Sequence, residues 1–409
     1  MTRRREPDRG EGIFSWMRMD EPPEEKWKRI EEEIAEEEGK TWVKLTDLDA
    51  NLADPFFSYI WFLEGYEESS NMYLIEGDYL TLVDTGNDIY AFFELFELGF
   101  KAEDIKKIFL THAHNDHTLG LMELMTRYGT FKDFEVIVHN SMSTGLLPRA
   151  IEQMARGGKV TGVDTGDTVN LSGLDFKVIY TPGHTQDCIC LYHEKTQTLF
   201  SGDTVLSFGL PTPDERIGGN LQDYLFSLRI LLEVDVKHLL PGHGFPEFFT
   251  GKNDVMGTYH GVILSLIPEG STWTEGAMEL MKKNLPHEAI FCLNKALEKD
   301  ANNIQALGLK GSCLTEIGRN EEAIECFDKI LEIRKDEGAF YSKGMALIKL
   351  KRHEEALESF DEALKINPSF EEANVGKGIA LMELGREEEA MKIEAFKKAF
   401  ELSKDFTSK

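Results

Sequence analysis

The sequence predicts a mixed α/β domain over residues 41–268 and an all-α repeat array over residues 269–405, with a tail at 406–409. From residue 41 onward, short apolar runs of strand length alternate with helical patterns, and the runs end at Gly, Pro, Asp or Asn. After Pro268 the strand-length runs stop and long helical periodicity begins. A chain of 409 residues is long enough for two or three domains, each with a core of its own.

The first 40 residues are rich in charge and poor in apolar side chains. They predict a flexible start followed by a solvated acidic helix in the stretch PPEEKWKRIEEEIAEEEGK. The amino terminus has no apolar core of the kind that a secretory signal needs, and no stretch approaches the ~20 apolar residues of a membrane span. We therefore expect no signal peptide and no membrane partner.

The net charge and the cysteine content limit which cellular compartment and which partners are expected. The chain has 45 Lys and Arg against 73 Asp and Glu, a formal net charge of −28, and its basic run is the short TRRR at residues 2–5. Such a charge repels nucleic acid, which makes a nucleic-acid partner a poor expectation. The five cysteines are scattered and form no CxxC pair, so reduced thiols and a cytoplasmic location are predicted.

Strands and helices alternate within residues 41–268. The predicted strands are NMYLIEG, YLTLVDTG, KKIFLTH, FEVIVHN, FKVIYTPGH, CICLYH, TLFSGD and KHLLPGHG, and the predicted helices include IYAFFELFELGF and LQDYLFSLRILLEV. Polar residues follow several of these strands directly. In α/β proteins the carboxyl ends of strands are where functional sites gather.

The run THAHNDH, residues 111–117, places three histidines and an aspartate directly after an apolar strand. Imidazole nitrogens and carboxylate oxygens at this density suit a borderline metal such as zinc. One loop cannot complete two coordination spheres, so further ligands are expected at other strand ends. Three candidates stand there, each beside Gly or Pro or both: His184 in TPGHT, Asp203 in SGDT and His243 in PGHG.

Together with Asp84 in LVDTG, this ordered set resembles the metallo-β-lactamase-fold hydrolases from about residue 50 to 250. The resemblance implies an αββα four-layer sandwich and seven ligands for two metals. It assigns His112, His114 and His184 to the first metal, Asp116, His117 and His243 to the second, and Asp203 to a bridge between them. Asp84 is implied to support the ligand loop from behind.

The implied chemistry is hydrolysis by a metal-bridging hydroxide. Two cations ~3.5–4 Å apart lower the pKa of a shared water toward ~7, so no separate side-chain base is required. Asp116 is a candidate to accept or relay a proton during turnover. Zinc is the first expectation, with iron and manganese left open. His139, at the end of FEVIVHN, and Cys188 are candidate pocket residues, although a loop histidine and a packing thiol are the simpler interpretations of each.

The spacing between the candidate ligands limits which branches of this family the chain can resemble. Only 39 residues separate Asp203 from His243, which is too short for the inserted domain of the nucleases that the chain resembles in part. The region GGNLQDYLFSLRILLEVDVKHLLPGHG resembles glyoxalase-II-like thioester hydrolases and lactonases, through Tyr224 and Ser227 among others. An ester, thioester or lactone is the expected small-molecule substrate. The alternatives are a mononuclear-iron persulfide dioxygenase, a phosphodiesterase or nuclease, and a scaffold whose metal site is not catalytic.

After Pro268 a repeat of 33 to 34 residues emerges, marked by Gly311, Gly344 and Gly378. Small residues and phenylalanines recur in register with these glycines, and the pattern resembles four tetratricopeptide repeats. About two extra residues near 392–394 predict an irregular last helix. In register, the groove residues would be Tyr341, Met345, Ile348, Val375, Ile379 and Met382. We expect this groove to hold a protein or peptide partner, a part of the same chain, or a second subunit in a homodimer.

Overall fold

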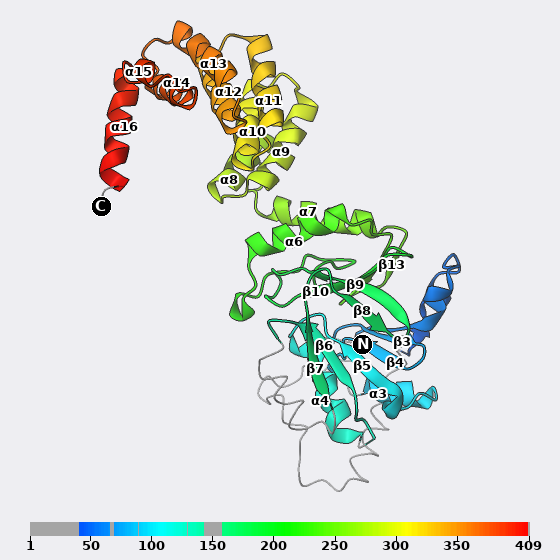
Figure 1. Cartoon of the computed structure of the whole chain (residues 1–409). Coiled ribbons are helices and arrows are strands. Elements are labelled where there is room, and N and C mark those ends of the chain that lie inside the picture. The colour runs from blue at the N-terminus through cyan, green and yellow to red at the C-terminus, as the bar shows by residue number, and fades with distance from the viewer. Residues whose placement is uncertain (1–40, 66–68, 89, 129, 143–157, 408–409) are drawn as a thin grey trace, which may run out of the picture. The chain divides into compact units, whose positions relative to one another are not determined.

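The computed structural model describes residues 41–65, 69–88, 90–128, 130–142 and 158–407 (Figure 1). The charged segment expected at residues 1–40 lies outside these described residues. The chain divides into two compact units, Met1–Tyr259 and His260–Lys409. The division falls within helix α7 (Gly251–Ser265), a few residues before the boundary that the sequence predicts at 268/269.

Two mixed sheets form the centre of the first unit (Figure 1). In the described residues, the first sheet follows chain order: β1 (Val43–Lys44), β2 (Ile60–Leu63), β3 (Met72–Glu76), β4 (Leu80–Val83), β5 (Ile105–Phe109), β6 (Glu135–His139) and β7 (Lys159–Val163). The second has the order β13 (Glu247–Phe248), β12 (His238–Pro241), β11 (Thr198–Gly202), β10 (Ile189–His193), β9 (Leu174–Tyr180) and β8 (Thr168–Leu171).

Helices and short turns of helix connect these strands. They are α2 (Leu45–Leu48), the 3-10 turn Pro55–Tyr59, α3 (Tyr90–Glu97), the 3-10 turn Ala102–Asp104, α4 (Asn115–Arg127), the 3-10 turn Glu215–Ile217 and α6 (Leu221–Glu233). No helix within the described residues is both long enough and apolar enough to span a bilayer.

Strand β3 shows how the layers form, because successive side chains of a strand point to opposite faces of its sheet. Leu74 packs in the apolar cluster that contains Phe92 of α3 and Leu121 of α4. Tyr73, the preceding residue, faces the other sheet, where its ring centroid lies 5.2 Å from that of Phe200 in β11. Both faces of the first sheet are therefore covered, one by helices and one by the second sheet.

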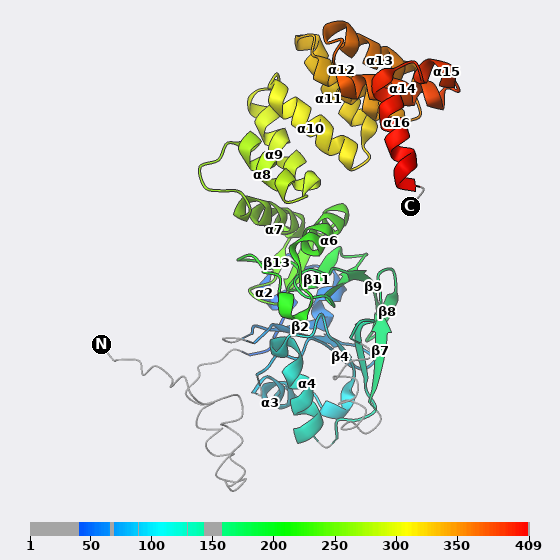
Figure 2. The same cartoon turned by 90° about the vertical axis from the view of Figure 1, so that its left-hand side faces the viewer.

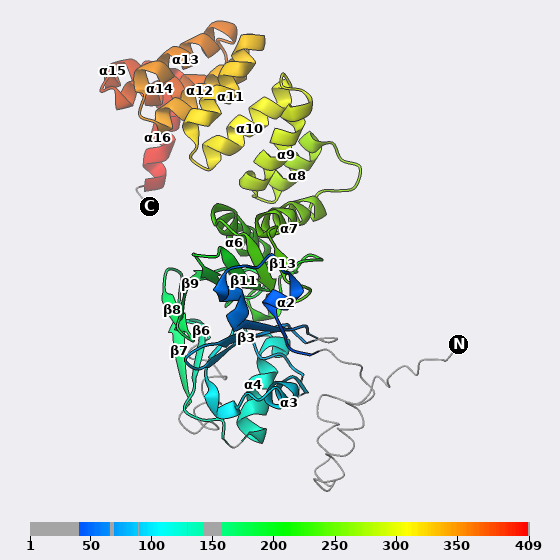
Figure 3. The same cartoon turned by 90° about the vertical axis from the view of Figure 1, so that its right-hand side faces the viewer.

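The second sheet is covered in the same way. Its inner face contributes to the core between the sheets, whereas Cys190, Leu199 and Leu239 on its outer face are fully buried without belonging to that core. Helix α6 lies over this outer face (Figure 3), and its own Tyr224 and Leu228 are fully buried. The first unit is thus an αββα four-layer sandwich, as predicted.

Parallel pairing brings the polar strand ends together. Strand β4 pairs in parallel with β5, which pairs in parallel with β6, and β11 pairs in parallel with β12. Asp84 follows β4, His112 follows β5 within three residues, Asp203 follows β11, and His243 follows β12 within two. Because the carboxyl ends of parallel strands meet at one edge of a sheet, these residues lie at the same edge of the sandwich.

The second unit is helical throughout its described residues from α8 onward (Figure 2). Its helices are α8 (Trp273–Lys282), α9 (Pro286–Lys299), α10 (Ile304–Glu316), α11 (Asn320–Ile333), α12 (Glu337–Lys349), α13 (His353–Ile366), α14 (Glu371–Glu383), α15 (Glu387–Ala390) and α16 (Glu394–Thr407). The last pair is interrupted where the sequence carries its extra residues, since α15 ends at Ala390 and α16 begins at Glu394.

One contact recurs in the repeats. A Cβ at Gly344 would lie 2.6 Å from Cε1 of Phe360, and a Cβ at Gly311 would lie 2.5 Å from the same atom of Phe327. At such distances any residue other than glycine would collide with the phenylalanine ring unless the ring shifted. The glycines that mark the repeat are therefore needed for the close approach of paired helices. The helical repeat array predicted by the sequence is confirmed.

Candidate metal centre

The loop after β5 supplies four of the candidate ligands because the chain changes from strand to helix within it. His112 and His114 leave the end of the strand, and His114 is the N-cap of α4. Asp116 and His117 then lie in the first turn of that helix, where the backbone N–H of His117 donates to the carbonyl of His114 at 3.1 Å. This short segment therefore supplies candidate ligands both from the end of a strand and from the first turn of a helix.

Three ring nitrogens and a carboxylate converge in the first cluster. Nε2 of His112 lies 2.9 Å from Nδ1 of His114, and Nε2 of His184 lies 3.0 Å from the same Nδ1. Oδ2 of Asp203 lies 3.5 Å from Nε2 of His184. All four ligand atoms lie within 4.8 Å of one another. This donor set suits a divalent cation of the zinc or iron type.

The second cluster contains Asp116, His117 and His243, again within 4.8 Å. Oδ2 of Asp116 lies 3.1 Å from Nε2 of His243 and 3.5 Å from Nε2 of His117. Asp203 reaches this cluster too: its Oδ1 is 3.4 Å from Nε2 of His117, and its Oδ2 is 3.5 Å from Nε2 of His243. The carboxylate of Asp203 therefore lies between the two clusters.

Two buried atoms test whether these residues fit a metal. Among the described residues, Nε2 of His117 and Oδ1 of Asp203 are buried and have no hydrogen-bond partner. Buried polar atoms without a partner are rare in proteins, and each one needs an explanation. A cation held between the clusters would satisfy both atoms. The donor chemistry and the unsatisfied atoms thus agree with metal binding.

The protonation states favour ligation by the first cluster. Burial, reinforced by the neighbouring His117, holds the pKa of His112 well below its usual value, and burial lowers the pKa of His184. Burial alone would raise the pKa of Asp203, but the charge of the neighbouring His117 holds it well below its usual range. Neutral imidazoles and an ionised carboxylate are the forms that bind metals.

The second cluster behaves differently. Burial opposes protonation of His117, but the carboxylates of Asp203 and Asp84 raise its pKa well above its usual value. Asp116 and Asp203 likewise raise the pKa of His243 to about 9 against the effect of burial. A metal that bound here would compete with protons for both imidazoles.

Asp84 supports the ligands from behind. Its Oδ2 lies 2.8 Å from Nδ1 of His117, and its Oδ1 accepts a hydrogen bond of 2.8 Å from the backbone N–H of Thr111. The hydroxyl of Thr111 donates to Oδ2 of Asp84 at 2.8 Å. These contacts fix the ring of His117 so that Nε2 points at the cluster. Asp84 has φ of 55°, a left-handed conformation that Asp and Asn tolerate better than most residues.

Gly242, the first glycine of the PGHG motif, is required by the close packing around it. A Cβ on Gly242 would lie 2.3 Å from Oδ1 of Asp203 and 2.9 Å from Cε1 of His117. Its backbone N–H donates to the carbonyl of Gly202 at 2.8 Å. Glycine therefore lets two ligand loops approach closely enough for Asp203 to reach both clusters.

The sequence did not predict two groups that orient ligands. Oδ2 of Asp214 lies 3.2 Å from Nε2 of His114, and Nδ1 of His184 donates to the carbonyl of Thr212 at 2.7 Å. Arg216 in turn holds the pKa of Asp214 well below its usual range. Both groups lie in the stretch PTPDER, which has no strand or helix periodicity. The run of prolines beside an acidic residue was the available signal, and it is a weak one.

The two candidate pocket residues are both buried. His139 is buried, stacks on Tyr180 at a centroid distance of 4.0 Å, and accepts or donates a hydrogen bond of 2.8 Å with the hydroxyl of Ser141. Cys188 is buried with its thiol 3.0 Å from the hydroxyl of Thr185, and burial raises its pKa well above the usual value. A neutral, enclosed thiol is the environment of a packing group and not of a nucleophile.

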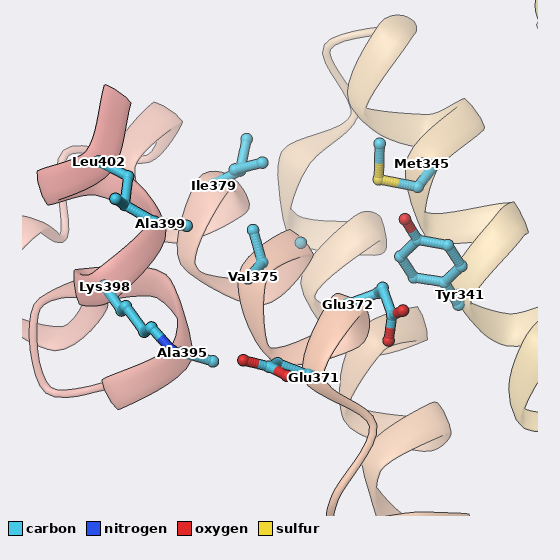
Figure 4. A pocket seen from close by; sticks show the side chains of 11 residues that line it. Tyr341, Met345, Glu371, Glu372, Val375, Ile379, Ala395, Lys398, Ala399 and Leu402 are labelled. Atoms are coloured by element: carbon cyan, nitrogen blue, oxygen red, sulfur yellow. The ribbon is translucent and has the colours of Figure 1, made fainter. Parts of the chain in front are cut away.

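A separate groove lies in the second unit (Figure 4). Its cavity is about 540 Å³, and four predicted groove residues line it: Tyr341, Met345, Val375 and Ile379. Ile348 and Met382 are not among the residues that line it; Met382 packs instead against the buried Leu381, Ala390 and Phe396. Helix α16 forms the opposite wall, and the charged residues at the groove are Glu371, Glu372 and Lys398 (Figure 4).

Comparison with known proteins agrees with this architecture. Residues 65–243 match the model of the metallo-beta-lactamase superfamily. Residues 347–393 match a tetratricopeptide repeat, and residues 282–363 match the model described as anaphase-promoting complex, cyclosome, subunit 3. The first unit therefore contains a metallo-β-lactamase domain, and the second contains tetratricopeptide-like repeats.

Curated relatives match less than half of this chain. An atrochrysone carboxyl ACP thioesterase of Aspergillus fumigatus is 26% identical over 180 residues, which cover 43% of this chain and 38% of that protein. The lactamase-like protein nscB of Trichophyton verrucosum is 29% identical over 150 residues, 36% of this chain and 45% of that protein. The chain thus spans about half or less of the length of these relatives.

Solved structures give weaker matches. A metallo-β-lactamase family protein from Thermus thermophilus covers 59% of this chain and 94% of its own, with 21% identity and a TM-score of 0.40. The structure of MamA covers 38% of this chain and 91% of its own, with 24% identity and a TM-score of 0.30.

Proposed function

We propose that this protein is a metal-dependent hydrolase with two divalent cations, zinc being the first candidate and iron or manganese the alternatives. The position of Asp203 carries the proposal, because its two carboxylate oxygens lie within 3.5 Å of ligand nitrogens from both clusters. A carboxylate between two imidazole clusters is suited to neutralise and bridge two cations.

Each side chain has a role in the proposed mechanism. His112, His114 and His184 would hold one cation, and Asp116, His117 and His243 the other. When bound, the two cations would lower the pKa of a shared water toward ~7 and polarise the substrate carbonyl. The proposed role of Asp116 is to accept a proton from the attacking water and return it to the leaving group, since its side chain is only half-buried.

We propose a thioester, with an ester or lactone as the close alternatives, as the small-molecule substrate. Support comes from the names of the relatives, several of which are ACP thioesterases. It also comes from the region that resembles glyoxalase-II-like enzymes. There, Tyr224 donates from its hydroxyl to the carbonyl of Thr204 at 2.9 Å, and Ser227 donates to the carbonyl of Pro182 at 2.6 Å. These bonds tie α6 to two ligand loops.

Metal analysis and turnover test this proposal together. The purified protein is expected to hold about two zinc, iron or manganese ions per chain and to hydrolyse acyl thioesters of N-acetylcysteamine. Chelation should abolish turnover, and addition of the same metal should restore it. A single bound iron with oxygen consumption on a persulfide would support the dioxygenase alternative, and turnover of a phosphodiester would support the nuclease alternative. Metal without turnover of any of these substrates would support a scaffold.

We further propose that the groove of the second unit binds a protein partner, which fits its repeat architecture and its apolar lining. A charge at Val375 should release a partner that the native protein retains. Ile366→Glu is the matched control, since Ile366 is exposed on α13 and does not line the groove. Equal retention by both variants would contradict the proposal, and a native dimer dissociated by Val375→Glu would identify the occupant as a second copy. The five buried, unpaired cysteines support a proposed cytoplasmic location.

A further inference from the structure

The loop at residues 204–213, here called the rim loop, is fixed beside the candidate metal centre at both ends. It begins directly after the bridging residue Asp203. Near its other end, the carbonyl of Thr212 accepts a hydrogen bond of 2.7 Å from Nδ1 of His184. Pro211 and Pro213, on either side of Thr212, have fixed φ angles that stiffen this end of the loop.

The rim loop turns two large apolar side chains toward solvent. Phe208 is 72% exposed and Leu210 is 42% exposed. Phe208 is nevertheless placed firmly, because its ring lies against the backbone of Gly244: a Cβ there would be 2.7 Å from Cε1 of Phe208. Gly244 directly follows the candidate ligand His243, so the ring lies beside the metal centre.

A third apolar side chain extends this surface. Phe245, which follows Gly244, is 56% exposed. The carbonyl of Gly244 accepts a hydrogen bond of 2.6 Å from Nδ2 of Asn71, which fixes the backbone that carries Phe245. One exposed phenylalanine needs no explanation, but here two stand on loops that each carry a candidate ligand, Asp203 or His243. Exposed apolar side chains that gather at a site mark a binding surface.

We propose that Phe208, Leu210 and Phe245, the apolar rim, bind the hydrophobic acyl group of the substrate and make the enzyme select long acyl thioesters over short ones. This inference rests on the proposed hydrolase function. The thioester carbonyl would lie at the metal centre and the acyl chain along the rim. In the reaction the water oxygen bonds to the acyl carbon, the carbon–sulfur bond breaks, and the products are a carboxylic acid and a thiol that takes up the remaining proton.

Chain-length dependence tests the rim. Each methylene group removed from water favours binding about fourfold, so the Kd of S-alkyl N-acetylcysteamine thioethers should fall stepwise from two to ten carbons. These thioethers have a methylene group where the thioester carbonyl would be, so their carbon–sulfur bond is not hydrolysed and calorimetry reports binding apart from turnover. Phe208→Ser should raise the Kd of the decyl thioether about tenfold, with little change for the ethyl compound. Phe208→Leu, which keeps an apolar surface, should restore most of the affinity.

Phe226→Ser is the matched control, because Phe226 is also a largely exposed phenylalanine but stands on α6 outside the rim. Equal effects of Phe208→Ser and Phe226→Ser, or a Kd independent of chain length, would overturn the inference. So would sedimentation showing that the rim is covered by a second copy and that Phe208→Ser only dissociates a dimer. If the thioethers bind as expected but no thioester is hydrolysed, the proposed reaction fails and the apolar site remains. If thioesters of all lengths are hydrolysed equally, the rim fails and the reaction remains.

Discussion

The two units of the molecule differ in the sequence separation of the residues that contact one another. In the candidate metal centre, His114 contacts Asp214 across 100 positions of sequence, and this contact has no repeated counterpart. In the repeats, Gly344 meets Phe360 only 16 positions later, and equivalent contacts recur at Gly311 and Gly378. A defect in the first unit should therefore disable its whole site, whereas a defect in the second should remain local to one repeat and its neighbours.

The strongest test of this difference removes the shared carboxylate. Asp203→Asn keeps the shape of the side chain but removes the charge that faces both clusters. We expect both metals to be lost or weakly held, and turnover to fall by about 10³-fold or more, because metal-bound catalysis supplies several kcal/mol. Metal content by elemental analysis and kcat/KM on a thioester measure the two effects. Asp175→Asn, at an exposed position of β9, is the control, and full occupancy of either site in Asp203→Asn would contradict the bridge.

A smaller effect is expected from a substitution at Asp84, which contacts the candidate ligand His117 and is not itself a candidate ligand. Asp84→Asn keeps a residue that tolerates the left-handed backbone at this position, but it loses one oxygen that faces His117 and Thr111. We expect affinity for the second metal to fall about 10- to 100-fold, with a smaller effect on the first. Competition with a chelator at graded concentrations separates the two affinities. Equal weakening of both metals would show that Asp84 supports the whole loop and not His117 alone.

That the seven candidate ligands come together could be predicted, because each stands in a short motif after a strand. Asp214 and Thr212 could not, because their position depends on the path of a loop that is closed by long-range bonds, such as the one from the N–H of Asp214 to the carbonyl of His184 at 2.7 Å. Likewise, the repeat register predicted four groove residues that line the cavity. It did not predict Lys398 and Leu402, because α16 reaches the groove only through the break after α15.

In the repeat unit, two alanine substitutions separate close packing from helix propensity. Both Gly344→Ala and Gly308→Ala gain about 0.5–1 kcal/mol of helix propensity. At Gly308 the new Cβ would be 3.8 Å from Cδ1 of Ile330, an ordinary contact, so this variant should be stabilised. At Gly344 it would collide with Phe360, and overpacking of about 1–3 kcal/mol should leave the variant net destabilised.

Hydrogen exchange in the full chain measures this local stability, through the amides of α12 and α13 for Gly344→Ala and those of α10 and α11 for Gly308→Ala. The loss in Gly344→Ala should be confined to α12, α13 and their neighbours, with kcat/KM unchanged. A loss of metal or turnover in this variant would contradict the local behaviour expected of repeats. Equal protection in both variants would show that the ring of Phe360 shifts at no cost.

The smallest effect is expected at an ion pair that the repeats also share. Arg319 donates to Glu322 at 2.6 Å, and the same i, i+3 pair recurs as Arg352 with Glu355 and Arg386 with Glu389. Because the pair recurs, it could be thought to stabilise the whole array. However, its side chains are largely exposed, so solvent and salt screen the attraction between the two charges. Arg319→Gln should therefore change the stability of α11 by about 0.5 kcal/mol or less, and less still in high salt. A larger loss by hydrogen exchange, or one that spreads beyond the adjoining helices, would mean that exposed repeat contacts act together and that the second unit is less local than its glycine contacts indicate.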